Sequence, residues 1–179
     1  MPKRTTGKIY LITGVMASGK SSVAQALAER FETSVHLRGD SFRRAIVRGR
    51  VDMGSQSEDE AYRQLRLRYQ LSVQAALGYA EAGFTVVYQD VILGPLLEDV
   101  VSAFGEADLQ VVVLCPNPAT VKERELGRAK VGYGAVTIEQ LQRGLAETPK
   151  IGLWIDSSAL SIDETLAQIL HPSSVQGPA

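Results

Sequence analysis

Short runs of apolar residues recur along this chain, separated by longer stretches in which apolar and polar residues mix. The runs are rich in Val, Ile and Leu, which is typical of strands buried on both faces of a parallel sheet. They predict strands at residues 9–13, 34–37, 85–89, 111–115 and 152–155. The stretches between them predict helices at residues 20–31, 41–48, about 58–82, 96–104, 119–129, 138–145 and 162–170. Strands and helices therefore alternate.

Several of the predicted helices carry start or stop signals. Thr137 with Gln140, and Ser161 with Glu164, have the spacing of capping boxes, in which a hydroxyl and a longer side chain satisfy backbone N–H groups. Gly83 follows the long helix, as a residue able to take positive φ should. Five strands joined by helices predict right-handed crossovers and an α/β fold, a parallel sheet with helices on both faces.

Length and composition limit the function classes. A chain of 179 residues is expected to form one domain, here residues 1–171, with an acceptor-side segment at about residues 40–82. A flexible tail at 172–179, rich in Pro, Ser and Gly, follows it. With 19 basic and 20 acidic residues, bulk binding to nucleic acid is not expected. No apolar run is long enough to span a membrane. The single cysteine, Cys115, excludes an internal disulfide and favours the reducing cytoplasm.

The most specific motif lies between the first strand and the first helix. Residues 14–21 fit G-x-x-x-x-G-K-[ST] without a mismatch, the pattern of a P-loop. Gly14 and Gly19 let backbone amides point at phosphate oxygens, Lys20 reaches the terminal phosphates, and Ser21 can ligate Mg²⁺. One alternative is an ordinary Gly-rich turn. Another is a secretory signal formed by Lys3, Arg4, the apolar residues 9–16 and Ala17. The complete motif and the helix pattern directly after it favour the P-loop.

An aspartate follows the second strand. Asp40 lies where a kinase would place a carboxylate that accepts the proton of an acceptor hydroxyl. The alternative is that Asp40 only caps the helix predicted at 41–48. Arg43 and Arg44 could hold an anionic acceptor or a phosphate, although one of two adjacent arginines on a helix should point to solvent.

A second aspartate follows the third strand. The apolar strand that ends at Asp90 has the outline of a Walker B segment, whose carboxylate holds the magnesium shell. Aspartate is also common where a strand ends in a turn. The sequence leaves open whether Asp90 binds magnesium, binds the acceptor, or only starts the turn.

Two arginines one helical turn apart predict a lid at about residues 120–136. Arg124 and Arg128 fall on one helix face, so both can stabilise charge on a transferring phosphoryl group. Gly132 and Gly134 would provide hinges. The alternative is a solvated helix face with partners such as Glu125.

Taken in order, these motifs resemble the chloramphenicol phosphotransferase-like proteins, within the P-loop branch of nucleoside-monophosphate, adenylylsulfate, gluconate and shikimate kinases. The resemblance covers nearly the whole chain and implies a sheet of order 2-3-1-4-5, ATP with Mg²⁺ as cofactors, and a small-molecule hydroxyl as acceptor. It implies that Asp40 is the general base, that Arg124 and Arg128 bind nucleotide, and that residues 157–160 lie near adenine. It places the ATP phosphates on Gly14, Val15, Met16, Ala17, Ser18, Gly19, Lys20, Ser21 and Ser22.

The acceptor itself is left open by two departures from that family. Residues 15–18 read Val-Met-Ala-Ser, whereas the drug kinase has Gly-Ser-Ser-Ala, and residues 43–57 are richer in arginine. An antibiotic, a sugar, a nucleotide-sugar or a metabolite acid all fit, and the arginines favour an anionic acceptor.

The leading hypothesis is therefore a cytoplasmic, ATP-dependent small-molecule phosphotransferase. One alternative is a zeta-toxin-like nucleotide-sugar kinase, which the arginines would suit. Another is a nucleotide-binding switch or regulatory ATPase that moves a partner protein. The lack of a long partner-binding extension argues against a switch.

Overall fold

A computed structural model of the chain describes residues 6–126 and 137–172. At its centre is a five-stranded sheet in which every pairing is parallel and the order is β2-β3-β1-β4-β5. The strands are β1 (Ile9–Gly14), β2 (Ser34–Arg38), β3 (Thr85–Gln89), β4 (Leu109–Leu114) and β5 (Leu153–Ile155). Both the α/β fold class and the strand order are confirmed.

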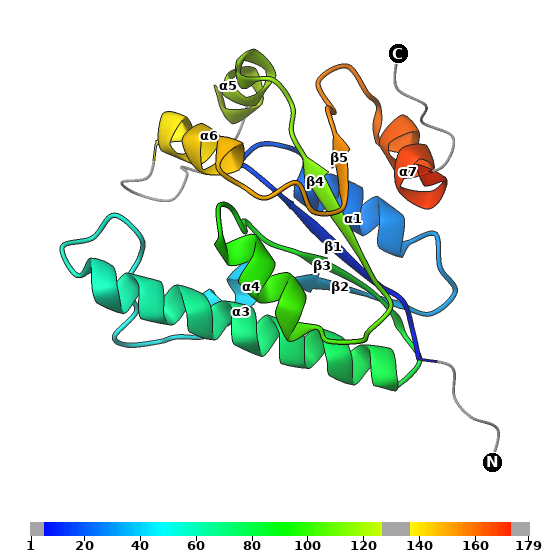
Figure 1. The fold of residues 1–179 in the computed structure, drawn as a ribbon, viewed down its shortest axis with the longest axis horizontal. Helices are drawn as coiled ribbons and strands as arrows, with labels where there is room; N and C mark the ends of the chain where they lie inside the picture. The colour runs from blue at the N-terminus through cyan, green and yellow to red at the C-terminus, as the bar shows by residue number, and fades with distance from the viewer. Residues whose placement is uncertain (1–5, 127–136, 173–179) are drawn as a thin grey trace.

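Helices cover both faces of the sheet (Figure 1). Helices α3 and α4 lie against one face, and α1 and α7 lie against the other, while α5 and α6 stand beyond the carboxyl end of β1. The helices are α1 (Lys20–Ala28), α2 (Asp40–Arg44), α3 (Glu58–Glu81), α4 (Leu96–Ala103), α5 (Pro118–Leu126), α6 (Ile138–Ala146) and α7 (Ile162–Leu170). The long helix α3 lies within the predicted acceptor-side segment, at residues 40–82, and packs against the sheet.

The central strand β1 divides the core into two halves. All six of its residues are buried, and successive side chains point to opposite faces. Ile9 and Leu11 pack with buried residues of α3 and α4, whereas Tyr10 and Ile12 pack with α1 and α7. Strand β1 is thereby held from both sides, which fixes the direction in which the chain leaves the sheet at Gly14.

The local signals predicted the element boundaries well where they were strong. Both capping boxes form, at the starts of α6 and α7. The helix predicted at 41–48 is shorter, because α2 has no buried residue and Val47 is almost fully exposed. A short helix without a packed apolar face has little to extend it. Arg128, Gly132, Gly134 and the tail beyond Pro172 lie outside the described residues.

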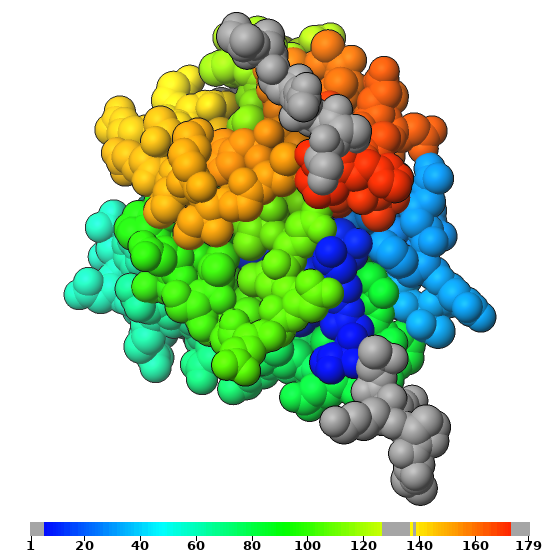
Figure 2. Space-filling model, turned by 45° about the vertical axis from the view of Figure 1, so that its right-hand side comes forward, coloured from blue at the N-terminus to red at the C-terminus, as the bar shows by residue number. Residues whose placement is uncertain are grey.

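The amino ends of the strands form a different part of the surface. Figure 2 shows the start of β1, in dark blue, beside the segment that leads into β4, in yellow-green. The Ile9 N–H donates to the Asp108 carbonyl at 2.8 Å and ties these two segments together. None of the predicted site residues that the structure describes belongs to this end. Across the described ranges, no helix has the length and apolar character that a membrane span requires.

Candidate functional site

The P-loop follows β1 and leads into α1. Gly14, Ala17 and Gly19 have φ angles of 142°, 59° and 93°, a left-handed course that bends the chain sharply. At Gly14 the approach to the neighbouring strand is also close, since a Cβ atom there would lie 2.3 Å from the Leu114 carbonyl oxygen. The N-cap residue of α1 is Gly19, which has no side chain to occupy the first N–H groups of the helix. The loop therefore presents backbone donors to an anion.

The ammonium group of Lys20 lies within this loop. Its Nζ atom donates to the Val15 carbonyl oxygen at 2.6 Å and to the Ser18 hydroxyl at 3.4 Å. The side chain is only 8% exposed. A positive charge is thus held inside the loop, where it strengthens the attraction for phosphate.

The hydroxyl of Ser21 contacts β3. It donates to Gln89 Oε1 at 3.1 Å. Side chains alternate along β3, so Val87 and Gln89 face the α1 side, whereas Tyr88 and the following Asp90 face the α3 side. Sequence reasoning did not select Gln89, although this alternation could have placed it beside the P-loop.

Asp90 forms a buried ion pair with Arg68 of α3. Arg68 Nη2 donates to Asp90 Oδ1 at 2.8 Å, the Val91 N–H donates to the same oxygen at 2.8 Å, and the Tyr88 hydroxyl donates to Oδ2 at 3.3 Å. Burial raises the pKa of the Asp90 carboxyl, and the charges of Arg68 and Lys20 oppose that rise. Arg68 is the main site-adjacent residue that sequence reasoning missed.

Asp40 begins α2 and is paired with both arginines of the same helix. Arg43 Nε donates to Oδ1 at 2.8 Å, and Arg44 Nε donates to Oδ2 at 2.6 Å. Partial burial by itself raises the pKa of Asp40, but the hydrogen bonds and charges of Arg43 and Arg44 outweigh it, so the pKa lies below its usual value. The N-cap of α2 is Gly39, and no side chain caps that helix end. Arg43 also pairs with Asp52, while Arg44 is the more exposed of the two arginines.

Arg124 joins three segments. From α5, its Nη1 donates to the Ser18 carbonyl oxygen of the P-loop at 3.4 Å, and its Nη2 donates to the Ser157 carbonyl oxygen at 2.9 Å. Ser157 follows β5 and is buried. The guanidinium thus lies directly beside the phosphate loop. The second predicted arginine, Arg128, is outside the described part of the chain.

Strand register places Asp40 and the P-loop at the same edge of the sheet. Ile12 of β1 pairs with Gln89 of β3, which pairs with Arg38 of β2. Gly14 lies two residues after Ile12, and Asp40 lies two residues after Arg38, so the two are at the same level of the sheet. With β3 between them, β1 and β2 are separated by roughly 10 Å. This is the edge at which ligands bind in parallel α/β sheets.

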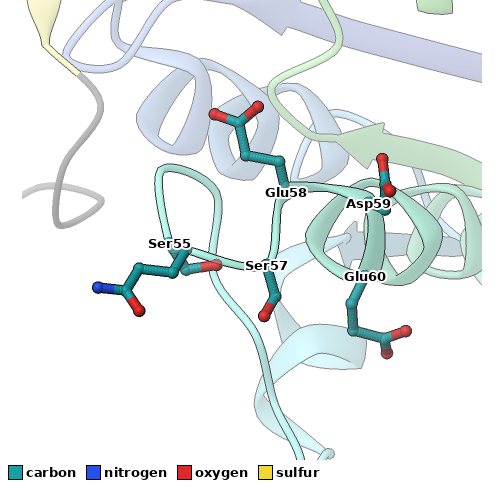
Figure 3. A pocket seen from close by; sticks show the side chains of 6 residues that line it. Ser55, Ser57, Glu58, Asp59 and Glu60 are labelled. Atoms are coloured by element: carbon teal, nitrogen blue, oxygen red, sulfur yellow. The ribbon is translucent and has the colours of Figure 1, made fainter.

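A pocket lies further out on the acceptor side, at the start of α3 (Figure 3). The Glu58 and Glu60 carboxylates point away from each other in this view. The lining is polar and acidic, made of Ser55, Gln56, Ser57, Glu58, Asp59 and Glu60. Among the described residues, no three His, Cys, Asp or Glu side chains form a metal-binding group.

Comparisons with known proteins show the family and the fold of this chain. The sequence model of the chloramphenicol phosphotransferase-like proteins matches residues 7–173. Among curated proteins, none matches the sequence.

Solved structures share the fold. The Mycobacterium tuberculosis APS kinase in complex with AMPPNP and APS aligns with a TM-score of 0.69 at 21% identity, over 95% of this chain and 99% of that one. The Deinococcus radiodurans tunicamycin resistance protein aligns with a TM-score of 0.64 at 19% identity, over 95% of this chain and 97% of that one. A gluconokinase from Sinorhizobium meliloti 1021 aligns with a TM-score of 0.61 at 20% identity, over 93% of this chain and 91% of that one.

Proposed function

The chain belongs to the chloramphenicol phosphotransferase-like protein family and has the fold of P-loop kinases, and on that premise we propose that it transfers the γ-phosphoryl group of ATP to a hydroxyl of a small molecule. The observation that carries the proposal is the convergence on one loop of two cationic side chains. Lys20 donates within the P-loop, and Arg124 donates to the carbonyl of Ser18 in the same loop. Such a cluster suits a polyphosphate whose charge shifts during transfer.

The proposed step needs a group that accepts the proton of the acceptor. Asp40 follows the end of β2, at the same level of the sheet as the P-loop. Its carboxyl is ionised at neutral pH, because its pKa is held below the usual value. The acceptor oxygen attacks the γ-phosphorus while its proton passes to the Asp40 carboxylate. The bond from the γ-phosphorus to the β–γ bridging oxygen breaks, and ADP leaves with that electron pair. Lys20 and Arg124 stabilise the charge that develops.

The residues at the P-loop also fit a magnesium ion. The Ser21 hydroxyl and the Gln89 amide oxygen are hard oxygen donors 3.1 Å apart, and Mg²⁺ commonly takes one or two protein ligands with water and phosphate oxygens as the rest. We propose Ser21 as its direct ligand and Gln89 as the residue that orients Ser21. When bound, the ion neutralises charge on the β- and γ-phosphates.

The contacts on the acceptor side do not favour an anionic acceptor. Arg43 and Arg44 both bind Asp40, and Arg43 also binds Asp52, so their charge is largely compensated within the chain. The pocket at the start of α3 adds the carboxylates of Glu58 and Asp59, among others. An uncharged or amino-bearing polyol therefore suits this side better than a sugar phosphate or an acid, which weakens the argument for a nucleotide-sugar acceptor.

A screen for acceptor-dependent ADP formation tests the proposal. The panel contains amphenicols, aminoglycosides, plain sugars, nucleotide-sugars and hydroxy acids, each with ATP and Mg²⁺. We expect at least one hydroxyl compound to stimulate ADP formation and to gain a phosphate by mass spectrometry. Lys20→Ala should abolish both signals, whereas Lys8→Ala, at the amino end of the sheet over the Tyr10 ring, should not. ATP hydrolysis that no acceptor stimulates, with a nucleotide-dependent complex in gel filtration, would instead indicate a regulatory ATPase.

A further inference from the structure

The buried ion pair between Asp90 and Arg68 lies next to the turn that carries Asp40. The two side chains are 2% and 6% exposed. Removing two charges from water is costly, and a protein with apolar side chains of similar size in place of a buried ion pair is often at least as stable. Stability alone therefore does not explain the ion pair. The contacts of the Asp90 carboxylate indicate another role for it.

Both oxygens of Asp90 are already engaged by the protein. Oδ1 accepts from Arg68 and from the Val91 N–H, and Oδ2 accepts from the Tyr88 hydroxyl. All of these partners are hydrogen-bond donors, which are the complement of a carboxylate and not of a cation site. At the end of β3 the oxygen that faces Ser21 belongs instead to Gln89.

The carboxylate also lies directly against Gly39. A Cβ atom at Gly39 would be 1.9 Å from Asp90 Oδ2 and 2.5 Å from Cγ. Gly39 has φ −58° and ψ −34°, a conformation open to any residue, so the backbone itself does not require glycine. The close approach of Asp90 requires it. The Gly39 N–H donates to the Gln89 carbonyl at 3.0 Å, which fixes the turn on its other side.

We propose that Asp90 is a positioning residue, held in place by Arg68, which fixes the turn at Gly39 and with it the position of Asp40, and that Asp90 is not a magnesium ligand. The inference rests on the proposed function, in which Asp40 must meet the acceptor hydroxyl. Because Arg68 belongs to α3, the same ion pair links the acceptor-side helix to this turn. A displacement of about 1 Å at such a turn can lower the rate of a reaction about 10²-fold.

The first test separates positioning from metal binding. For Asp90→Asn and Gly39→Ala, the Mg²⁺ dependence of binding of a non-hydrolysable ATP analogue is measured by calorimetry, alongside kcat and KM for ATP. We expect both variants to lose kcat by about 10²-fold, with the Mg²⁺ dependence and KM unchanged. A large increase in the Mg²⁺ requirement of Asp90→Asn, but not of Gly39→Ala, would overturn the proposal and make Asp90 a metal ligand.

A second test remains informative if Asp90→Asn folds poorly or if no acceptor is found. Gly39→Ala is made in the wild type and in an Arg68→Met/Asp90→Ala background, and chemical denaturation is followed for all four proteins. The background removes both charges and the two atoms closest to the added Cβ, Asp90 Oδ2 and Cγ, and leaves only the Cβ of residue 90 at 3.2 Å. Gly39→Ala should therefore destabilise the wild type clearly more than the background. Equal destabilisation in both backgrounds would refute the contact. Since neither this cycle nor analogue binding needs an acceptor, failure of the proposed reaction would be recognised separately.

Discussion

The close passage of the P-loop beside β4 leads to a quantitative prediction for Gly14→Ala. The new Cβ atom would lie 2.3 Å from the Leu114 carbonyl oxygen and 3.1 Å from Ser18 Oγ, at a φ of 142°. An ordinary contact begins at 3.4 Å, so β1 and β4 must separate by about 1 Å, against the close packing of the core.

The expected loss of stability has two parts. Side chains at such φ values cost about 1–3 kcal/mol, and forcing a methyl group into a packed core costs about 1–3 kcal/mol. Gly14→Ala should therefore lower the free energy of unfolding by about 2–6 kcal/mol. Gly19 has a φ of 93°, but the atom nearest to a Cβ added there, Arg124 Nη1, would be 3.8 Å away. For Gly19→Ala we therefore expect a loss of only about 1–2 kcal/mol, from the backbone conformation alone.

Urea denaturation measures both losses, with an unchanged slope m as evidence that the unfolding reaction is the same. Gly105→Ala is the matched control, because Gly105 has a φ of 57° and no atom within 4 Å of the added Cβ. ATP binding by calorimetry should weaken for Gly14→Ala and stay unchanged for the control. A Gly14→Ala protein as stable as Gly105→Ala, with normal ATP binding, would refute the argument from close approach.

Three further predictions concern single contacts. Arg44→Gln removes one of the charges that lower the pKa of Asp40. The acidic limb of the pH–rate profile for kcat should therefore move to higher pH, toward the pKa of an ordinary aspartate. An unmoved limb would show that the limb does not report the titration of Asp40. Arg124→Ala removes a positive charge beside the P-loop and its hydrogen bond to the Ser18 carbonyl, and should weaken ATP binding about tenfold by calorimetry, with unchanged affinity as the contrary result. Thr13→Val leaves the buried N–H and C=O of Ile92 without their partner and should cost about 2–4 kcal/mol in urea denaturation; a loss near zero would contradict it.

The sequence predicted best those features that depend on neighbouring residues. Thr85–Gln89 and Ile162–Leu170 begin and end where the pattern placed them, since a buried apolar run and a capping box are local signals. The same holds for the P-loop, whose glycines take the positive φ angles that the motif requires. The end of α2 was missed because it depends on whether Val47 is packed, which only the folded chain decides.

The contacts of the site were harder to predict. Arg68 lies in a helix whose other arginines are largely exposed, and nothing local marks it as the one that meets Asp90, 22 residues away. Asp90 and Gln89 could have been assigned to opposite faces from the alternation of β3 alone. The pairing of Arg43 and Arg44 with Asp40 follows helix spacing, but the involvement of Asp52 depends on the path of the loop between α2 and α3.

Asp40→Asn tests whether Asp40 accepts the proton of the acceptor hydroxyl. Transfer of labelled γ-phosphate to the acceptor and calorimetric binding of an ATP analogue are measured for wild type, Asp40→Asn and the control Asp52→Asn, which removes the charge of another Arg43 partner. We expect Asp40→Asn to bind the analogue normally and to lose transfer by about 10²-fold or more, and Asp52→Asn to retain most of its activity. Undiminished transfer by Asp40→Asn would show that Asp40 is not the general base.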